Sequence, residues 1–487
     1  MKESIKIAFF KGQTKSILTG FCLITALCLL VGIAKEWYFL AVLPIALLVG
    51  YIALIDFKKL FWLLLASIPI ATEVSLPGGL TLDIPDEPLM IGLTGIYLLY
   101  MLKPGRKLSD NVFNHPITII LFLHLSWIFI TAITSQIHFV SFKFFASKIW
   151  YIIPFYFLAG RIVINKEDWK KVFWVILIPL VFTVIFVLLK HAAVGFSLKG
   201  INKAVRPFYR NHVSYACLMV LFMPFMWYAL KWYKRDSKQW WLVIFGIVIL
   251  FLGIQFSYTR AAYVALVGAI GAYYIIKFRL IKYVLAAGTI AAIVGVVYFT
   301  HNNKYLDYAP DFEKTITHEN FGNLLDATTK GQDVSTMERV YRWVAGMHMV
   351  SERPVMGFGP GNFPRFYKEY TVPMFKTYVS DNEDDSGVHN YFFTVAVEQG
   401  IIGMLIFTLL CFVVLLKGEQ VFHRTKDIFY QRMIMTAMLS YIIILLLLLM
   451  NDMVETDKVG TFFFLCMAVI VQVDLYNQKV LKEKTID

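Results

Sequence analysis

Long apolar runs recur along this chain from one end to the other, and they constrain its fold more than any other feature. An α-helix needs about 20 apolar residues to cross the hydrocarbon core of a bilayer, and most of these runs approach that length. Inside a bilayer the backbone must satisfy its own hydrogen bonds, so such runs predict helices rather than open sheets. The sequence therefore predicts an all-α polytopic membrane protein with about 12–14 transmembrane helices.

The expected spans divide the chain into helices and connecting loops. Two of them are weaker than the rest, because 59–72 is short and Pro154 interrupts 149–164, so either could be re-entrant or lie in the membrane interface. In chain order the expected spans are 17–34, 37–55, 59–72, 88–102, 117–134, 149–164, 171–190, 212–230, 240–256, 260–276, 281–300, 391–416, 433–450 and 459–476.

The composition agrees with a membrane protein. Of the 487 residues, 58% are hydrophobic and 16% are charged, whereas a soluble domain has about 25% charged residues. The net charge of +13 does not indicate a nucleic-acid partner, because Lys and Arg occur in short clusters between the apolar runs. The five cysteines all fall inside apolar runs, so we expect them to pack in the interior rather than to form disulfides or a metal site.

The distribution of basic residues predicts the orientation of the chain. A basic N-terminal segment precedes the first apolar run, which is long enough for a retained span rather than a signal peptide. With the N-terminus in the cytoplasm, the inside segments hold more than twice as many Lys and Arg residues as the short outside loops. Short basic loops stay inside, whereas long loops cross regardless of charge. We therefore expect both termini in the cytoplasm and residues 301–388 on the outer face.

Two polar segments are expected on the outer face, residues 190–211 and the much longer residues 301–388. Aromatic residues and an amphipathic stretch from Met337 to Val350 predict that the longer segment is partly helical. Arg353-Pro354 ends that helix. The glycines of 357–361 then predict a tight turn, since glycine tolerates a positive φ. A static turn is favoured over a hinge, and a lid role for the segment stays open.

Three residues with chemical potential lie at the outer ends of spans. Arg210 and Arg260 each adjoin an expected span, and His389 precedes another. Taken singly, an arginine at a membrane interface most often reaches for lipid headgroups, and a histidine at a loop end most often has a structural role. Their joint occurrence on one face favours a shared anionic ligand, either a lipid phosphate or a substrate phosphate.

Two arginines and a histidine suit transfer from a phosphate-linked donor. Arginine donates paired hydrogen bonds to phosphate and keeps its charge. A pair of arginines can stabilise a diphosphate leaving group without a metal. A histidine with a pKa near ~6.5 can accept the proton of an acceptor hydroxyl. Glycosyl transfer from a lipid diphosphate requires these functions and few others.

Other chemistries find less support in the sequence. It contains no His-Glu-x-x-His zinc motif, no Gly-x-Ser-x-Gly elbow and no P-loop. The acidic stretch Asp381–Asp385 could bind a divalent cation, but its spacing matches no calcium loop and favours a solvated loop. The middles of the apolar runs are almost free of charge, which argues against an ion-coupled transporter.

Several short motifs follow one another in a fixed order between about residues 200 and 410. They are Arg210-Asn211-His212, Tyr258-Thr259-Arg260-Ala261-Ala262, Arg339-Val340-Tyr341-Arg342-Trp343, residues 354–363, His389-Asn390 and Glu398-Gln399-Gly400-Ile401-Ile402-Gly403. With the single long outer segment before the histidine, this order resembles the O-antigen ligase and O-antigen polymerase superfamily of bacterial envelope glycosyltransferases.

The resemblance implies a multi-span (GT-C-type) glycosyltransferase of the bacterial inner membrane that needs neither metal nor cofactor. Members of that superfamily move a glycan from undecaprenyl diphosphate to an acceptor at the periplasmic face. By position, His389 is expected to be the catalytic base that activates the acceptor hydroxyl, and direct attack is expected to invert the anomeric carbon. Arg210 and Arg260 are expected to bind the diphosphate. Residues that could assist are Arg339, Arg342, His212 and Tyr258.

The resemblance leaves the acceptor open. Ligation to lipid A-core is favoured, with polymerisation of lipid-linked repeat units and transfer to protein serine or threonine as alternatives, and a lipid-linked glycan flippase as an alternative of another class. The implied partners are the undecaprenyl-diphosphate-linked donor, the acceptor and membrane lipids. The expected parts of the chain are N-terminal helices at 1–200 that form a groove for the lipid carrier, central helices at 201–300, the periplasmic loop at 301–389 and C-terminal helices at 390–487.

Overall fold

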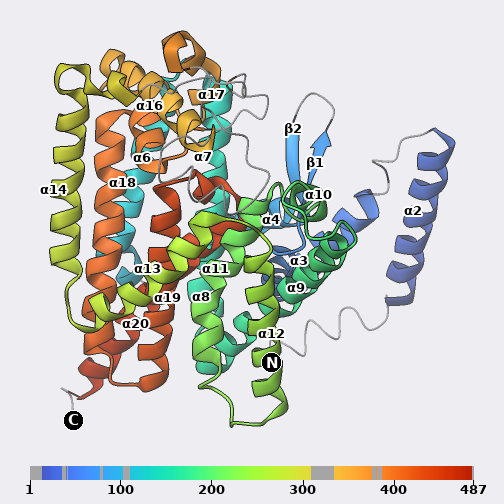
Figure 1. Ribbon diagram of the computed structural model, residues 1–487. Coiled ribbons are helices and arrows are strands. Elements are labelled where there is room, and N and C mark those ends of the chain that lie inside the picture. The colour runs from blue at the N-terminus through green and yellow to red at the C-terminus, as the bar shows by residue number, and fades with distance from the viewer. Residues whose placement is uncertain are drawn as a thin grey trace.

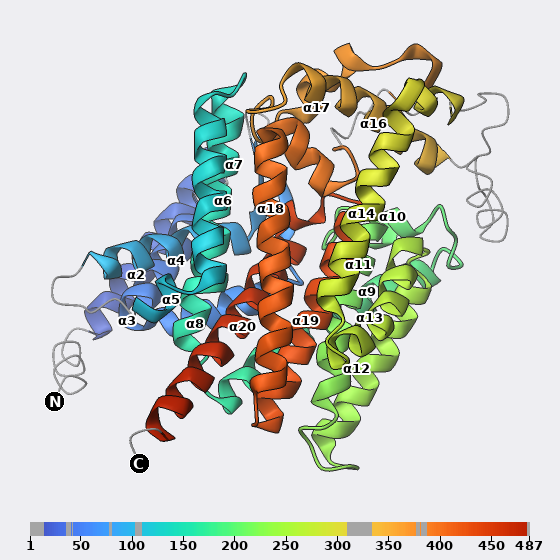
Figure 2. The ribbon, with the colours of Figure 1, turned by 90° about the vertical axis from the view of Figure 1, so that its left-hand side faces the viewer.

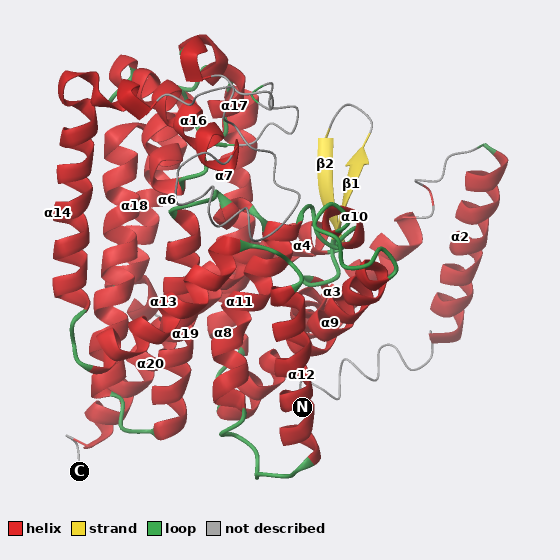
Figure 3. Ribbon diagram, viewed as in Figure 1, coloured by secondary structure: helices red, strands yellow, loops and turns green. Residues whose placement is uncertain are grey.

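The computed structural model describes residues 14–35, 40, 42–76, 80–102, 110–308, 334–375, 380 and 387–484. Helices make up most of this part of the chain, and most of them run side by side in one bundle (Figures 1 and 3). The polytopic helical fold predicted from the apolar runs is confirmed.

Nine helices in the described ranges are long and apolar enough to cross a membrane. Each coincides with one of the expected spans, because hydropathy over a helix length is the signal that defines both. They are α6 (Pro116–Ile133), α9 (Lys166–Ala192), α11 (His212–Ala229), α12 (Lys238–Gln255), α13 (Arg260–Lys277), α14 (Ile281–Thr300), α18 (Tyr391–Arg424), α19 (Ile428–Leu448) and α20 (Asp457–Lys484).

The N-terminal third contains further apolar helices. α2 (Thr14–Ala34) covers the first expected span, and α4 (Asp86–Met101) covers the fourth. The second and third expected spans are joined in α3 (Val42–Ser67). Asp56 leaves the helical conformation there, with φ −153° and ψ 85°, so α3 bends where the sequence predicted a loop between two helices. The short α5 (Asp110–Phe113) precedes α6.

The weak span around Pro154 is helical throughout. α7 (His138–Ile152) continues into a π-helical turn, η2 (Ile153–Leu158), and then into α8 (Ala159–Ile162). Proline lacks an amide N–H and its ring clashes with the carbonyl one turn back, and a wider π turn accommodates such a break. The interruption is therefore a local widening of a helix and not a re-entrant loop.

A β-hairpin between α3 and α4 departs from the all-α prediction (Figure 3). β1 (Thr72–Leu76) pairs antiparallel with β2 (Leu80–Ile84). The sequence alternates polar and apolar residues from Glu73 onwards, which is the period of a strand. The expected span at 59–72 overran the end of α3 and concealed this pattern.

The centre of the bundle is formed by α11, α19 and α20, whose side chains are largely buried. α19 packs against α11, α13 and α20. The Ser440 hydroxyl of α19 donates to the Leu221 carbonyl of α11 at 2.6 Å, a polar contact of the kind that joins helices in a membrane. By contrast, α14 lies at the edge of the bundle and exposes apolar side chains along its length, as a lipid-facing helix does (Figure 1).

A small helical layer covers one end of the bundle (Figures 1 and 2). Some of its residues form an apolar core that is separate from the core of the bundle. The helix predicted from Met337 to Val350 is confirmed within this layer. The elements at this end are η3 (His301–Tyr308), α16 (Val334–Glu352), α17 (Phe363–Phe366), η5 (Tyr367–Tyr370) and η6 (Pro373–Phe375).

The glycine-rich turn at 357–361 is hydrogen-bonded to α18. The amides of Phe358 and Gly359 donate to two consecutive carbonyls of α18, at 3.1 and 2.8 Å. α18 departs from helical geometry at Gly400, where φ is 74°, and a Cβ at Gly400 would lie 1.9 Å from the Val355 carbonyl oxygen. These contacts agree with the static turn that the sequence favoured.

Glu398 fastens the same turn from within α18. Its two carboxylate oxygens accept the amides of Gly361 and Phe363 at 2.7 and 3.1 Å. A buried carboxylate is stabilised only where hydrogen bonds replace its water. The next residue, Gln399, accepts a hydrogen bond from the Trp127 indole at its carbonyl, at 2.9 Å. The contacts between residues 357–363 and residues 397–400 of α18 therefore form a joint between the small helical layer and the bundle.

Candidate functional site

His389 lies in the turn that leads into α18. Asn390 caps the helix by accepting the Phe393 amide at 3.1 Å. His389 itself has a positive φ of 60°, a conformation that costs about 1–3 kcal/mol and persists only where the surroundings hold it. Two neighbouring segments, one from the α19–α20 connection and one from α16, supply that support.

Asp452, in the connection between α19 and α20, holds the backbone of this turn. Its Oδ2 accepts the His389 amide at 3.2 Å, and its Oδ1 accepts the Thr394 hydroxyl at 2.8 Å. A Cβ on Gly387 would lie 2.2 Å from Asp452 Oδ2, so glycine allows the carboxylate to approach this closely. Burial raises the pKa of Asp452 to about 6.

Arg342 of α16 contacts the imidazole of His389. Its Nη1 lies 2.8 Å from His389 Nε2 and also donates to the Gly387 carbonyl at 3.1 Å. On its other side the guanidinium pairs with Glu338 at 3.4 Å. Because arginine can only donate hydrogen bonds, Nε2 accepts this one. The proton of the neutral ring is then on Nδ1.

The same surroundings keep His389 uncharged. Burial, and after it the positive charges of Arg342 and Arg339, lowers the pKa of His389 to about 3. Arg339 and Arg342 are about one turn apart on α16 and therefore lie on the same side of that helix. The imidazole is thus a neutral base at pH 7, with its acceptor nitrogen occupied by Arg342 in this structure.

Arg210 and Arg260 lie at the starts of α11 and α13, which contact each other. The Thr259 hydroxyl, next to Arg260, donates to the His212 carbonyl at 3.3 Å, and His212 closely follows Arg210 in the chain. Arg210 is exposed and Arg260 is half-buried. The two arginines therefore flank a single contact between the ends of two spans.

Two side chains that were expected to assist make local hydrogen bonds instead. The Tyr258 hydroxyl donates to the Phe196 carbonyl at 2.7 Å, and His212 Nδ1 lies 2.8 Å from Asn202 Oδ1. Both contacts fasten the loop that contains α10 (Ile201–Ala204). They favour a positioning role for Tyr258 and His212 over direct participation in chemistry.

The connection between α19 and α20 borders both groups of residues. At the start of α20, Lys458 places its Nζ 5.6 Å from the centre of the Tyr209 ring, and Tyr209 adjoins Arg210. The same connection carries η7 (Met453–Glu455) and, just before it, Asp452, which holds His389. The arginine pair and the histidine turn are therefore linked through one short segment.

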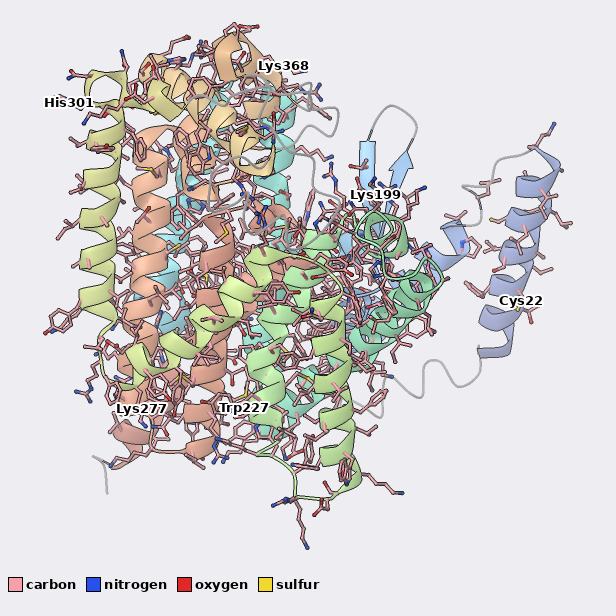
Figure 4. The ribbon with its side chains drawn as sticks, viewed as in Figure 1. Cys22, Lys199, Trp227, Lys277, His301 and Lys368 are labelled. Atoms are coloured by element: carbon pink, nitrogen blue, oxygen red, sulfur yellow. The ribbon has the colours of Figure 1, made fainter. Side chains whose placement is uncertain are left out.

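The side chains labelled in Figure 4 indicate which loops share an end of the molecule. Lys199, from the loop before Arg210, lies in the upper part of the view together with His301 and Lys368, from the segment before His389. Lys277 and Trp227 lie in the lower part (Figure 4). The described parts of 190–211 and 301–388 thus lie towards the same end of the molecule.

Three charged residues near His389 were missed from the sequence. Lys148 Nζ lies 2.6 Å from Glu455 Oε1, the Tyr391 hydroxyl donates to the same oxygen, and Asp452 holds the His389 amide. Asp452 and Glu455 could have been singled out from the sequence, since they lie in a short polar stretch between two expected spans. Nothing in the sequence marked Lys148, because it directly precedes an expected span and resembles a cation that flanks a membrane helix. The acidic stretch Asp381–Asp385 lies outside the described residues.

The fold and this site define a polytopic membrane protein with a histidine and several arginines at one end of its helices. Residues 245–408 match the O-antigen ligase family, so the chain contains an O-antigen ligase family domain. Members of that family are enzymes that transfer glycans, as ligases or polymerases. The matched range includes Arg260, Arg342 and His389 but not Arg210. No curated protein matches the sequence.

Proposed function

We propose that this protein transfers a glycan from undecaprenyl diphosphate to an acceptor hydroxyl of lipid A-core, at the periplasmic face of the bacterial inner membrane. Transfer is metal-independent and inverts the anomeric carbon. The observation that carries the proposal is the neutral imidazole of His389 held against the Arg342 guanidinium, within an O-antigen ligase family domain. Together they supply a base and a cation at one point.

His389 is the general base in this proposal. Its acceptor nitrogen, Nε2, takes the proton of the attacking hydroxyl as the new C–O bond forms. The bond between the anomeric carbon and the diphosphate oxygen breaks, and the lipid diphosphate leaves with the bonding electrons. Attack from the face opposite the leaving group inverts the anomeric carbon. General-base catalysis of this kind contributes roughly 10²–10⁴-fold to a rate.

Arginines bind the diphosphate. Arg210 and Arg260 present planar, permanently charged groups that match phosphate oxygens, and Arg342 completes the site with help from Arg339. Before the donor binds, Arg342 occupies Nε2 of His389. A diphosphate is a stronger partner for a guanidinium than a neutral imidazole is, so donor binding draws Arg342 away and frees the base. The nearby anion also raises the pKa of His389, which makes it a better base when the donor is in place.

The proposal assigns a part to each region of the chain. Both termini are cytoplasmic, and residues 301–389 lie in the periplasm. Residues 1–200 form the groove for the lipid carrier, the helices at 201–300 supply the arginine pair, and residues 390–487 complete the bundle. Exposed apolar side chains on α2, α4 and α6 suit contact with membrane lipids or a polyprenyl chain.

Polymerisation of lipid-linked repeat units is the second candidate, because ligases and polymerases share the family domain that the chain contains. Both reactions use the same donor and the same base. They differ in the acceptor hydroxyl, which belongs to lipid A-core in one case and to a second lipid-linked glycan in the other. The test of the proposal must therefore read both products.

The test uses a bacterial strain whose own O-antigen ligase gene has been deleted. Expression of the wild-type protein is expected to restore a ladder of polysaccharide on lipid A-core, read on a lipopolysaccharide gel. Arg260→Lys is expected to lose the ladder, since a point charge does not reproduce two parallel hydrogen bonds. Arg365→Lys, at an exposed arginine of α17, is the matched control.

The outcomes of this experiment separate the candidates. A ladder on lipid A-core supports ligation, and longer polymer on the lipid carrier without a ladder supports polymerisation. A ladder of full strength from Arg260→Lys would overturn the diphosphate-binding role of Arg260. Neither product from the wild-type protein, in strains that supply matched donor and acceptor, would overturn the proposed transfer.

A further inference from the structure

Glu455 is a carboxylate that contacts the start of α18, just after the proposed base, and the mechanism above does not use it. It ends η7, shortly after Asp452 in the connection between α19 and α20. Its side chain is 28% exposed, whereas the side chain of its partner Lys148 is 5% exposed. The carboxylate therefore reaches the surface near the turn that carries His389, and the lysine is buried behind it.

Lys148, from α7, is a buried cation whose charge is balanced by Glu455. Its Nζ lies 2.6 Å from Glu455 Oε1 and 3.4 Å from the Tyr391 hydroxyl. The Phe144 ring centre is 5.0 Å away, and the small cavity beside the lysine is lined mainly by apolar side chains. A buried charge is stabilised only when it is paired, so Glu455 is the counter-ion of the buried Lys148 ammonium.

The two oxygens of Glu455 have different surroundings. Oε1 receives both internal donors, the Lys148 ammonium and the Tyr391 hydroxyl. Oε2 receives no hydrogen bond from the part of the chain that the structure describes. An ionised carboxylate accepts hydrogen bonds at both oxygens, and bonds to a charged acceptor are stronger than those between neutral groups. Sugar hydroxyl groups are donors of the kind that this oxygen can take.

Contacts within the site connect Glu455 to the turn that carries the base. Tyr391 begins α18 just after His389, and its hydroxyl donates to Glu455. Asp452, from the same connection as Glu455, accepts the His389 amide at 3.2 Å. The two carboxylates thus hold one turn from one short segment. A sugar hydroxyl bound at Glu455 is therefore near the hydroxyl that His389 deprotonates.

We propose that Glu455, paired with Lys148, binds the acceptor sugar by accepting a hydrogen bond from one of its hydroxyl groups at Oε2. This role rests on the proposed glycan transfer and specifies where the acceptor lies. Glu455 orients the sugar so that a neighbouring hydroxyl faces His389, and it takes no proton itself. The ligand is a sugar rather than the diphosphate, because a carboxylate repels an anion.

The test compares the purified wild-type protein with Glu455→Gln. Glutamine keeps an acceptor oxygen for Lys148 and Tyr391 but places an NH₂ group where Oε2 lies. Initial transfer rates are measured against the concentrations of undecaprenyl-diphosphate-linked glycan and of lipid A-core. The expected result is a KM for lipid A-core raised about tenfold or more, with the KM for the donor and the hydrolysis of the donor by water within about twofold.

Two further variants show whether the lysine acts through the glutamate. Lys148→Met is expected to raise the same KM, because Glu455 then loses its ionic partner, and Lys148→Arg is expected to restore part of the loss. Asp427→Asn is the matched control. It removes a partly exposed ion pair in another connection, where Lys166 Nζ lies 2.7 Å from Asp427 Oδ2. That control is expected to leave both KM values unchanged.

The outcomes that would overturn the inference are distinct from those that overturn the transfer itself. An unchanged KM for lipid A-core in Glu455→Gln, with the loss confined to kcat or to the yield of folded protein, would mean that Glu455 only supports the turn. Should Glu455→Gln not fold, Glu455→Asp keeps the charge but withdraws the oxygens, and the same comparison applies. Absence of transfer by the wild-type protein would overturn both proposals, whereas normal transfer with unchanged KM values in the variants would overturn the acceptor role alone.

Discussion

The imidazole of His389 and the guanidinium of Arg342 lie 2.8 Å apart, and this contact adds to burial in keeping the histidine neutral. Arginine keeps its proton under all conditions in which proteins fold, so the histidine is the partner that stays neutral. Burial and two arginines lower the pKa of His389 to about 3. The same contact occupies the lone pair that a base needs, which makes the activity of His389 depend on where Arg342 lies.

Replacing Arg342 by glutamine is expected to change the pH dependence of transfer. In the wild-type protein the pKa of His389 is about 3, so protonation of this residue removes no activity between about pH 5 and 7. Without the guanidinium that pKa rises, while burial and Arg339 still hold it below its ordinary value of about 6.5. The kcat/KM of Arg342→Gln, divided by that of the wild type, is therefore expected to fall as the pH is lowered from about 7 to 5.

The ratio reports the loss of the Arg342 charge from both titrating neighbours, because Arg342 also lowers the pKa of Asp452, which is about 6 in the wild-type protein. Arg365→Gln, at an exposed arginine of α17, is the matched control and is expected to follow the wild-type profile. A ratio for Arg342→Gln that stays constant with pH would contradict the influence of Arg342 on the base.

At the scale of helices and loops, the spans could be predicted and the joints between them could not. Each span follows from the hydropathy of consecutive residues, which the sequence displays directly. The joint between the turn at 357–361 and α18 depends on contacts between distant residues, such as the Gly359 amide and the Glu398 carbonyl. The β-hairpin at 72–84 was missed because its short alternating pattern adjoins a long apolar run.

The candidate site, like the fold, could be predicted only in part from the sequence. Arg210, Arg260 and His389 were singled out because their residue types and positions at span ends suggest phosphate chemistry. Asp452 and Glu455 support the histidine turn from the connection between α19 and α20. Nothing in the local sequence indicates that this connection folds onto a turn more than 50 residues earlier in the chain.

Gly400→Ala is expected to destabilise the protein by about 2 kcal/mol or more, because a residue with a side chain is strained at this positive φ and its Cβ overlaps the Val355 carbonyl. Gly271→Ala in α13 is the matched control, since a Cβ there meets nothing within 4 Å. Alanine in a helix interior stabilises by about 0.5–1 kcal/mol relative to glycine. Thermal unfolding in detergent, followed by tryptophan fluorescence, measures the stability of both variants. Equal melting temperatures for the two variants would contradict a tightly packed contact at Gly400.

At the scale of the whole molecule, the proposed transfer needs the histidine and the arginines on the periplasmic side. The pattern of basic residues predicts that orientation, and the loops that carry the site lie towards one end of the bundle (Figure 4). The five native cysteines lie within helices, and all but Cys22 are buried. Cysteines introduced at exposed positions near either end of the molecule can therefore report which end faces which side.

Single cysteines introduced at Lys368 and at Lys277 are expected to differ in their reaction with a membrane-impermeant thiol reagent. Both positions are exposed, and they lie at opposite ends of the molecule in Figure 4. In cells with a permeabilised outer membrane, Lys368→Cys is expected to react and Lys277→Cys to react only after the inner membrane is opened. The wild-type protein provides the background from the native cysteines. The reverse pattern would contradict the proposed orientation.

The central claim is glycan transfer that depends on His389 and on no metal, and the most direct measurement is transfer by the purified protein in lipid vesicles. The vesicles contain undecaprenyl-diphosphate-linked glycan and lipid A-core, with EDTA in excess. The wild-type protein and the control His301→Ala, at an exposed histidine of η3, are expected to form product. His389→Ala is expected to bind the donor normally and to lose about 10²-fold or more of the rate. Transfer by His389→Ala at the wild-type rate, or a wild-type activity that disappears in EDTA and returns with Mg²⁺ or Mn²⁺, would contradict the claim.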